Sequence, residues 1–333
     1  QTRRPRSPLR PAPGRRSASP RAADPSFSLA LALVFSVVLL LGPGGGLAKG
    51  SAPAAGESPS GPGPGWSLLW RDDFEGEAGS PPSPDEWIIA TGTNYPGGPA
   101  NWGTGEVQIY TADPGNVSLD GDGHLVIAPI RLASGRWTSA RIETRRAFMP
   151  PEGGALRIEG RIRLPAVTGV EAAGYWPAFW ALGAPYRGDY WNWPSVGEFD
   201  IMENVNGIDR IWQAVHCGTT PGGPCNEPSG IGTSAPCPPP GCREAFHVYA
   251  FEWDRSTRPN ELRWYIDGEL TFRVLETRFP AATWAAMTQH GYFLLINVAM
   301  GGGFPAAFGG GPTAGTRSGA PLVVDYVAVY VRQ

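Results

Sequence analysis

The chain of 333 residues has room for one large all-β domain or two small ones, and its 46 glycines, 36 prolines and low charged fraction of 17% suit a turn-rich β protein. The net charge of −3 hides an asymmetry: residues 1–50 carry seven Arg and one Lys against one acid, which leaves 19 basic and 29 acidic residues, a net charge of −10, in residues 51–333. This acidic balance makes nucleic acid a poor partner, because phosphates bind Lys and Arg, whereas neutral polysaccharide is compatible with it.

The start of the chain is predicted to be a targeting segment. Residues 1–48 form a basic leader and secretory signal, in which arginines precede a 15-residue apolar run at 27–41, and Gly46-Leu47-Ala48 or Ala52-Pro53-Ala54 offers a cleavage site. The run is shorter than the roughly 20 residues of a membrane span. We therefore expect a cleaved signal and no stable membrane association, with an uncleaved anchor as the alternative. Residues 49–65 are a Pro/Gly/Ser-rich linker, too polar to pack.

From Trp66 onward the sequence becomes a series of short alternating runs separated by turn residues, which predict strands. The clearest is 155–164, with apolar residues at every second position and Arg or Glu on the face expected to meet solvent. The others are 123–127, 175–182, 198–205, 246–253, 291–299 and 321–331. Asp267-Gly268 between two alternating arms predicts a hairpin at 261–272, and only 281–288 predicts a short helix. We expect residues 66–333 to form one all-β domain, a two-sheet antiparallel β-sandwich.

All four cysteines fall within 26 residues, namely Cys217, Cys225, Cys237 and Cys242. In an exported chain an even, local set predicts two disulfides that pin a Gly/Pro-rich loop. Three pairings are possible, and the spacing does not select one. Zinc is the alternative, but the seven, eleven and four intervening residues lack the Cys-x-x-Cys pair of structural zinc sites.

Three acids stand in one short apolar run, Glu198, Asp200 and Glu203. Strand alternation puts Glu198 and Asp200 on one face, whereas Glu203 comes one position late. A β-bulge supplies one extra residue and would turn Glu203 back beside the other two. Crowded carboxyls raise one another's pKa and resist burial. We therefore interpret the run as the floor of a catalytic groove, with a solvated acidic strand as the alternative.

Retaining glycoside hydrolysis needs such a group. One carboxylate attacks the anomeric carbon, and a carboxylic acid about 5–5.5 Å away protonates the leaving oxygen. Asp200 is expected to hydrogen-bond Glu198 and to help keep one acid ionised and the other protonated. Tryptophans at 102, 176, 180, 191 and 193 offer flat faces on which pyranose rings pack, although a place in the core is the alternative for some of them. No cofactor is expected for this chemistry.

The run from Trp193 to Asn204, WPSVGEFDIMEN, resembles the active-site strand of glycoside hydrolase family 16 in its bulged, laminarinase-like form. The likeness extends over most of residues 66–333 and includes DDFEG at 72–76, Trp102-Gly103 with Glu106 and Gln108, TSARI at 138–142, WPAFW at 176–180, NVAMGG at 297–302 and VDYVAVY at 324–330. The resemblance implies a jelly roll of the concanavalin A-like kind. It also implies that Glu198 is the nucleophile, Asp200 its assistant and Glu203 the acid/base.

The resemblance further suggests which residues contact the sugar. The substrate-binding residues that we expect are Trp102, Glu106, Arg141, Trp180, Trp193 and His216. Trp180 and Trp193 would surround the cleaved residue, and His216 would contact the leaving-group side, with a structural histidine as the alternative. Many laminarinase-like members carry Asn where this chain has Thr104-Gly105, so the contacts on the non-reducing side are expected to differ.

Glu75 and Asp325 match a structural calcium site of the family on the convex face, with a backbone carbonyl from the neighbourhood of Gly121. Calcium takes oxygen ligands from carboxylates and carbonyls. The alternative is two ordinary surface acids.

We therefore expect a secreted monomer that hydrolyses internal β-1,3 linkages, or the 1,3 linkages of mixed 1,3/1,4-glucan, with retention. One alternative is a non-catalytic, lectin-like glucan-binding module, against which the intact acid trio argues. The other is a transglycosylase, or a hydrolase of another β-glycan such as agar or carrageenan. The acidic charge weighs against sulfated polymers, because like charges repel.

Overall fold

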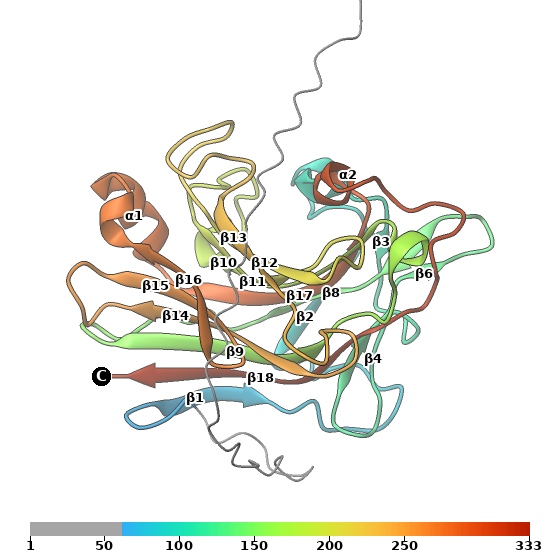
Figure 1. The fold of residues 1–333 in the computed structure, drawn as a ribbon, viewed down its shortest axis with the longest axis horizontal. Helices are drawn as coiled ribbons and strands as arrows, with labels where there is room; N and C mark the ends of the chain where they lie inside the picture. Colours follow the sequence, from blue (N-terminus) through green and yellow to red (C-terminus); the bar gives the residue numbers. More distant parts are fainter. Residues whose placement is uncertain (1–61) are drawn as a thin grey trace, which may run out of the picture. The chain divides into compact units, whose positions relative to one another are not determined.

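The computed structural model describes residues 62–333, which fold into two large antiparallel β-sheets packed face to face (Figure 1). The predicted leader at 1–48 and residues 49–61 of the predicted linker lie outside the described residues. Within 62–333, no helix has both the length and the apolar character needed to cross a membrane.

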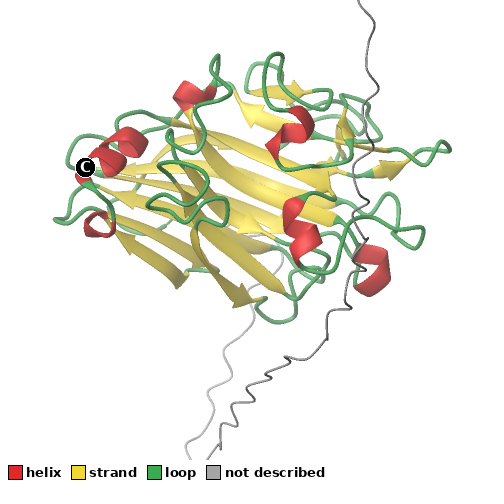
Figure 2. Ribbon diagram, turned by 90° about the horizontal axis from the view of Figure 1, so that it is seen from above, coloured by secondary structure: helices red, strands yellow, loops and turns green. Residues whose placement is uncertain are grey.

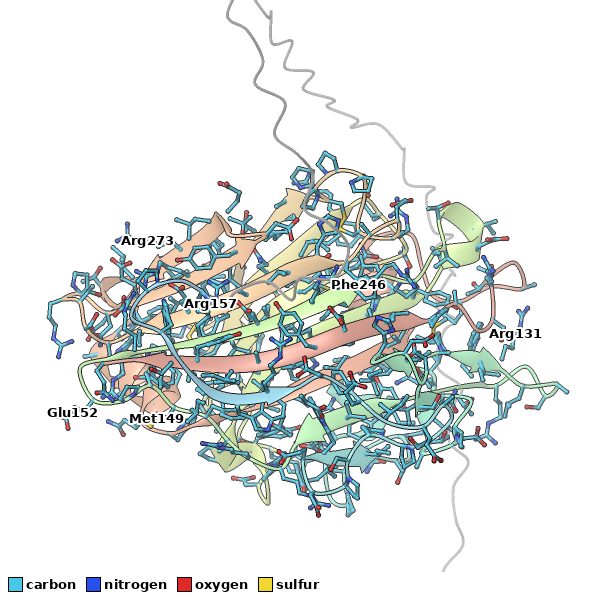
Figure 3. The ribbon with its side chains drawn as sticks, turned by 90° about the horizontal axis from the view of Figure 1, so that it is seen from below. Arg131, Met149, Glu152, Arg157, Phe246 and Arg273 are labelled. Carbon is cyan, nitrogen blue, oxygen red and sulfur yellow. A yellow bond between two sulfur atoms is a disulfide. The ribbon has the colours of Figure 1, made fainter. Side chains whose placement is uncertain are left out.

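The outer sheet runs in the order β16-β15-β14-β9-β18-β5-β4, with β1 paired to β18. Its strands are β1 (Ser67–Asp72), β4 (Val117–Leu119), β5 (Leu125–Ile127), β9 (Ala155–Arg163), β14 (His247–Asp254), β15 (Glu261–Ile266), β16 (Glu269–Leu275) and β18 (Leu322–Arg332). Figure 3 looks onto this sheet from its solvent side, with Arg157 and Arg273 on its surface.

The inner sheet runs in the order β13-β12-β11-β10-β17-β8-β2. Its strands are β2 (Trp87–Ala90), β8 (Arg141–Thr144), β10 (Tyr175–Gly183), β11 (Glu198–Glu203), β12 (Arg210–His216), β13 (Ile231–Pro236) and β17 (Tyr292–Met300). Loops and short helices border its strands when the molecule is seen from above (Figure 2). A small third sheet contains β3 (Ile109–Tyr110), β6 (Ile130–Arg131) and β7 (Trp137–Ser139). The α-helices of the described residues are α1 (Ala281–Thr288) and α2 (Gly303–Ala307). Four 3-10 turns accompany them, η1 (Ala100–Gly103), η2 (Gly169–Ala172), η3 (Ala184–Tyr186) and η4 (Glu276–Arg278).

Aromatic side chains fill the space between the two large sheets, because alternate residues of each strand point inward. Phe199 of β11 stacks on Phe251 of β14 at 4.6 Å between ring centroids and on Tyr292 of β17 at 4.4 Å. The indole N–H of Trp264 donates to the backbone carbonyl of Asp200 at 2.8 Å. The core therefore supports β11 from behind and leaves its other face free for polar side chains.

The sequence predicted most long elements to within two residues. The helix at 281–288 is confirmed, and so is the hairpin: Asp267 and Gly268 both have positive φ, 49° and 83°, as a tight turn between paired strands requires. One expectation was wrong in part. Arg157 and Glu159 of β9 do not face open solvent but are 8% and 5% exposed, because Arg157 forms ion pairs with Glu159 and with Glu252 on the adjacent strand.

Candidate active site

A bulge in β11 brings the three acids to one face of the inner sheet. Trp180 of β10 pairs with Asp200, but its neighbour Phe179 pairs with Met202, so one extra residue is inserted between these positions. Ile201 and Met202 are both fully buried in the core, whereas Glu198 and Glu203 are partly exposed on the opposite face. The bulge that the spacing predicted is therefore present, and it turns Glu203 to the same face of the sheet as Glu198 and Asp200.

Strand register assembles the rest of this surface. Cross-strand partners point to the same side of a sheet, and one row of partners crosses five neighbouring strands from Arg141 through Asn297, Ala178 and Glu203 to Trp212. A second row begins at Glu143 and ends at Ala214, with Leu295, Trp180 and Asp200 between them. Residues that are far apart in the sequence thus meet at the acids.

Glu203 is tied to β10 by a hydrogen bond. The indole N–H of Trp176 donates to Glu203 Oε1 at 2.7 Å. Burial and the nearby Asp200 raise the pKa of Glu203 well above its usual value, while the Trp176 bond and His216 oppose that rise by stabilising the ionised form. This setting favours the protonated form of the Glu203 carboxyl.

Glu198 lies opposite His216 in the β11–β12 register. Burial and Asp200 raise the pKa of Glu198 to about 8, against the lowering influence of the cations His216 and Arg141. Asp200 Oδ2 lies 3.1 Å from His216 Nε2 as an ion pair but has no hydrogen-bond partner among the described residues. Among the described residues, no hydrogen bond joins Asp200 to Glu198 as the sequence analysis expected. His216, and not Glu198, is the close polar neighbour of Asp200.

His216 is held as a cation. Burial by itself would lower its pKa, but the carboxylates of Asp200 and Glu227 outweigh burial and raise the pKa well above its usual value. Its two ring nitrogens have separate partners, since Nδ1 bonds Glu227 at 2.7 Å while Nε2 faces Asp200 and, at 4.0 Å, Glu198. Glu198, Asp200 and His216 each bring one potential metal-ligating atom to within 4.8 Å of the others, although a protonated imidazole has no lone pair left for a metal.

Arg141 forms the other side of the site. Its guanidinium lies 4.7 Å from the ring centroid of Trp102 and 4.8 Å from that of Trp180, and it donates to the hydroxyl of Tyr95 at 3.0 Å. Trp180 is itself fixed by an N–H bond to Asn297 at 2.7 Å. The predicted residues Trp102, Arg141 and Trp180 are thus neighbours in space.

Glu106 is more deeply embedded than a sugar-binding residue needs to be. It is 6% exposed, and its carboxylate accepts hydrogen bonds from Thr104 at 2.8 Å, from Gln108 at 2.5 Å and from Tyr110 at 2.8 Å. Tyr110 in turn accepts from Asn297. Glu106 thus supports the residues beneath Trp180, and its contact with a sugar stays a prediction.

The sequence interpretation singled out Trp176 and Trp193 but missed other aromatic residues at the two ends of this surface, namely Tyr95, Tyr190, Trp212, Phe304 and Phe308. Next to Glu203, Trp176 and Trp212 both contact Phe304 at 5.6 Å between centroids, and Phe308 lies 5.2 Å from Trp212. Beyond Arg141, Tyr190 stacks on Tyr95 at 4.4 Å, and Trp193 lies 5.7 Å from His216. Phe304 and Phe308 stand in a glycine-rich segment without a strand pattern, and only the ring contacts in the structure show that they meet Trp212.

The cysteines form two local disulfides, Cys217–Cys225 and Cys237–Cys242, which resolves the pairing that the spacing left open. The first follows His216 directly. The outer-face acids also come together, in a shallow pocket that is lined by Arg71, Asp73, Glu75, Asp122, Gly123 and Asp325.

Several known proteins are similar to this chain over most of its length. No model of a protein family matches the chain. Among curated proteins, a beta-glucanase of Rhodothermus marinus is 36% identical over 282 residues, 80% of this chain and 86% of that protein. A glucan endo-1,3-beta-glucosidase of Cryptopygus antarcticus is 29% identical over 280 residues, 80% and 92% of the two chains.

Solved structures agree with the curated relatives. The endo-1,3-beta-glucanase from Streptomyces sioyaensis is 57% identical, with a TM-score of 0.81 over 85% of this chain and all of that one. The endo-beta-1,3-glucanase from Pyrococcus furiosus is 31% identical, with a TM-score of 0.66 over 80% of this chain and 95% of that one.

Proposed function

Because the chain belongs to the laminarinase-like endo-1,3-β-glucanases of glycoside hydrolase family 16, we propose that it hydrolyses internal β-1,3 linkages of glucan by a retaining double displacement at its three-acid strand. The observation that supports this mechanism best is the β11 bulge, which puts Glu198, Asp200 and Glu203 on one face among tryptophans. Binding alone does not need three crowded carboxyls, whereas double displacement needs two of them with opposite protonation.

The electrostatics support an assignment of the two roles. Burial and Asp200 raise the pKa of Glu198 to about 8, but the cations His216 and Arg141 act against that rise and favour the ionised form, so we assign Glu198 the role of the nucleophile that attacks the anomeric carbon. Burial and the charge of Asp200 raise the pKa of Glu203 well above its usual value and favour its protonated form, so we assign Glu203 the role of the acid that protonates the leaving glycosidic oxygen. In the second step Glu203 takes a proton from water, and the water releases the sugar from Glu198. Asp200 pairs with His216 between them.

The substrate is a neutral glucan. Tryptophan faces on both sides of the acids fit the C–H faces of pyranose rings, and the net charge of −10 in residues 51–333 repels sulfated polymers. We place Trp102, Arg141, Trp180 and Trp193 on the side of the glycone, next to Glu198, and the Trp212–Phe304 cluster on the side of the leaving group, next to Glu203. Mixed 1,3/1,4-glucan remains a candidate for its 1,3 linkages.

We also propose a structural calcium ion on the outer face. The pocket around Glu75 and Asp325 offers four carboxylates against one lining arginine, Arg71, and a carbonyl-bearing turn at Gly123, which is the oxygen-rich set that calcium prefers. Arg161, which pairs with Asp325, competes for one carboxylate. Glu75, Asp325 and the backbone near Gly123 would hold the ion, which would stabilise the fold and take no part in hydrolysis.

Secretion is the remaining proposal. The basic leader with its apolar run supports it, and so do the two disulfides, because disulfides persist in oxidising compartments.

The decisive experiment replaces each acid and measures hydrolysis of laminarin, lichenan, agarose and carrageenan, with product sizes read by chromatography. Glu198→Gln should reduce kcat on laminarin by at least about 10⁴-fold, since it removes the nucleophile. Glu203→Gln should reduce it by about 10²–10⁴-fold, the range of acid–base catalysis. The exposed Glu152→Gln is the control and should match the wild type. Near-wild-type hydrolysis by Glu198→Gln would refute the assignment.

A further inference from the structure

The side chain of Glu227 is buried in a segment that has no other charge. Between Cys217 and Cys242 it is the only charged residue, and its side chain is completely inaccessible to solvent. An ionised carboxylate in such a place requires partners. Its partners are two: Oε1 accepts the backbone N–H of Cys217 at 2.8 Å, and Oε2 bonds Nδ1 of His216 at 2.7 Å.

The remaining faces of His216 are also occupied. The ring of Trp193 lies 5.7 Å away on one side. The backbone of Gly230 lies on another, so close that a Cβ at this position would approach ring atom Cε1 to 2.8 Å. Nε2 is therefore directed at the carboxylates of Asp200 and Glu198. The imidazole has one orientation in this cage, and Glu227 determines which nitrogen faces the acids.

A disulfide fixes Glu227 in turn. Cys225 stands two residues before it and is bonded to Cys217, the residue after His216. Glu227 and Gly222 also exchange two backbone hydrogen bonds across this small loop, at 2.6 and 2.7 Å. The covalent link thus closes a ring that contains both the carboxylate and the backbone N–H that it accepts.

We propose that Glu227 is a positioning residue for the hydrolysis, which holds His216 as a correctly oriented cation against Glu198 and Asp200, and that the Cys217–Cys225 disulfide keeps Glu227 in place. The inference rests on the proposed role of Glu198 as nucleophile. It assigns Glu227 no contact with the substrate.

The charges around His216 explain how its protonation affects Glu198. It is faced by Asp200 and Glu198 from β11 and by Glu227 from the loop, and Glu203 and Arg141 act on the same acids. While His216 is protonated, it offsets the charge of Asp200 and makes Glu198 easier to ionise. If His216 lost its proton, the charge of Asp200 would make Glu198 harder to ionise. A smaller fraction of Glu198 would then be the carboxylate that attacks the sugar.

Glu227→Gln tests the proposal, because glutamine can still accept the Nδ1–H bond but carries no charge. Loss of a neighbouring opposite charge should lower the pKa of His216 by about 1–3 units. The alkaline limb of the kcat/KM profile on laminarin should move to lower pH, since His216 would now deprotonate in the working range. Imidazole NMR signals, assigned by comparison with His216→Gln, report the titration of His216 independently of turnover. Glu227→Asp, which keeps the charge, should titrate more like the wild type.

The disulfide gives a second variant with a matched control. Cys217→Ser with Cys225→Ser should shift the His216 titration and the alkaline limb in the same direction as Glu227→Gln. Cys237→Ser with Cys242→Ser, which opens the neighbouring disulfide, should leave both unchanged. An unshifted His216 titration in Glu227→Gln, whether or not activity falls, would overturn the inference. Persistent hydrolysis by Glu198→Gln would refute the proposed function instead, and the two failures are therefore distinguishable.

Discussion

At the scale of single residues, the proposed acid/base, Glu203, is tuned by a hydrogen bond from Trp176 on the neighbouring strand β10. Trp176 donates to Glu203 Oε1 at 2.7 Å and thereby stabilises the ionised carboxylate. Trp176→Phe removes this donor and keeps an aromatic ring, so the pKa of Glu203 should rise further. A hydrogen bond to a charged group contributes about 1.5 kcal/mol or more, so the shift should be about one pH unit. The alkaline limb of kcat/KM should then move to higher pH, because Glu203 must be protonated to act.

Trp180→Phe is the control for that experiment. Its N–H bonds Asn297 and not a catalytic carboxylate, so the variant can change KM while the alkaline limb stays where it is. A limb that is unmoved or displaced to lower pH in Trp176→Phe would show that the hydrogen bond does not set the pKa of Glu203.

The sequence predicted that the three acids share one face of a strand, but not the contacts through which other residues act on them. Glu198, Asp200 and Glu203 were predictable because strand alternation and one extra residue decide which way neighbouring side chains point. Glu227 has no such local signal. Its role depends on a disulfide pairing that the cysteine spacing left open, and on the alignment of β12 with β11. The Asp200–His216 contact was missed for the same reason, since it joins two strands whose register the sequence did not fix.

At the scale of elements, the short helix α2 gives the leaving-group side of the site its own aromatic surface. Phe304 of α2 contacts both Trp176 and Trp212, and Trp212 is the register partner of Glu203. Phe304→Ala should therefore weaken binding of the leaving portion of the chain, raising KM for short laminarin oligosaccharides. Loss of one sugar-stacking ring is expected to cost about 1–2 kcal/mol, or roughly 5–30-fold in kcat/KM.

The comparison that isolates this effect is between variants at the two ends of the surface around the three acids. Trp102→Phe, on the opposite side of the acids, should alter which products accumulate without the same loss on short substrates. If Phe304→Ala cleaves short and long substrates with wild-type parameters, α2 does not belong to the binding surface.

Prediction of elements from the sequence succeeded where periodicity extended over enough residues. Most long strands of the two large sheets carry clear patterns, whereas β3, β6 and β7 have only two or three residues each and no period to detect. β12 was missed although Ile211, Gln213 and Val215 alternate inward, because the buried Gln213 interrupts the apolar pattern. The structure explains that exception, since Thr271 donates to its side-chain oxygen at 2.6 Å and its amide donates to the carbonyl of Ile201.

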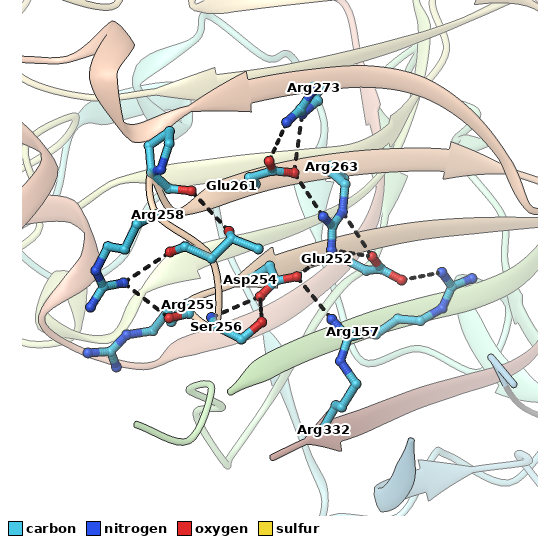
Figure 4. A network of polar contacts seen from close by, with 12 residues as sticks. Arg157, Glu252, Asp254, Arg255, Ser256, Arg258, Glu261, Arg263, Arg273 and Arg332 are labelled. Carbon is cyan, nitrogen blue, oxygen red and sulfur yellow. Dashed lines mark hydrogen bonds and ion pairs between the residues drawn. The ribbon is translucent and has the colours of Figure 1, made fainter. Parts of the chain in front are cut away.

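At the scale of the whole molecule, an arginine network links strands β9, β14, β15, β16 and β18 of the outer sheet (Figure 4). All 19 basic residues of 51–333 are arginines, and a planar guanidinium can bridge two carboxylates at once. Arg263 contacts Glu252, Asp254 and Glu261, and Arg332 also bonds Asp254. Asp254 is only 2% exposed, so the network encloses its charge and does not leave it to solvent.

This network predicts how stability depends on pH. Burial would raise the pKa of Asp254, but hydrogen bonds from Ser256 and Arg263 outweigh it, and the folded-state pKa is lowered; Arg273 likewise lowers that of Glu261. A lowered folded-state pKa gives stability that is present above the unfolded value of about 4 and is lost as the pH falls further. Asp254→Asn should cost about 3 kcal/mol at pH 7, and its Tm should fall less below pH 4 than that of the wild type.

Thermal melts between pH 2.5 and 7 measure both effects. Exposed Asp85→Asn is the matched control and should follow the wild-type curve. If the Tm of Asp254→Asn and that of the wild type fall by the same amount on acidification, the network does not contribute to the loss of stability at low pH.

Calcium at the outer-face pocket should also raise the thermal stability of the fold, through binding of an ion and not through ion pairs. An ion that binds only the folded chain raises its stability by RT ln(1 + [L]/Kd), about 2.7 kcal/mol at one hundred times Kd. Addition of EDTA should therefore lower Tm by several degrees, and calcium in excess should restore it, while laminarin hydrolysis at low temperature stays unchanged because the pocket residues are not on the catalytic strand. Glu75→Gln should lower Tm to the chelated value and abolish the response to EDTA. A wild-type Tm that does not respond to either reagent would show that Glu75 and Asp325 are ordinary surface acids, of which Asp325 pairs with Arg161.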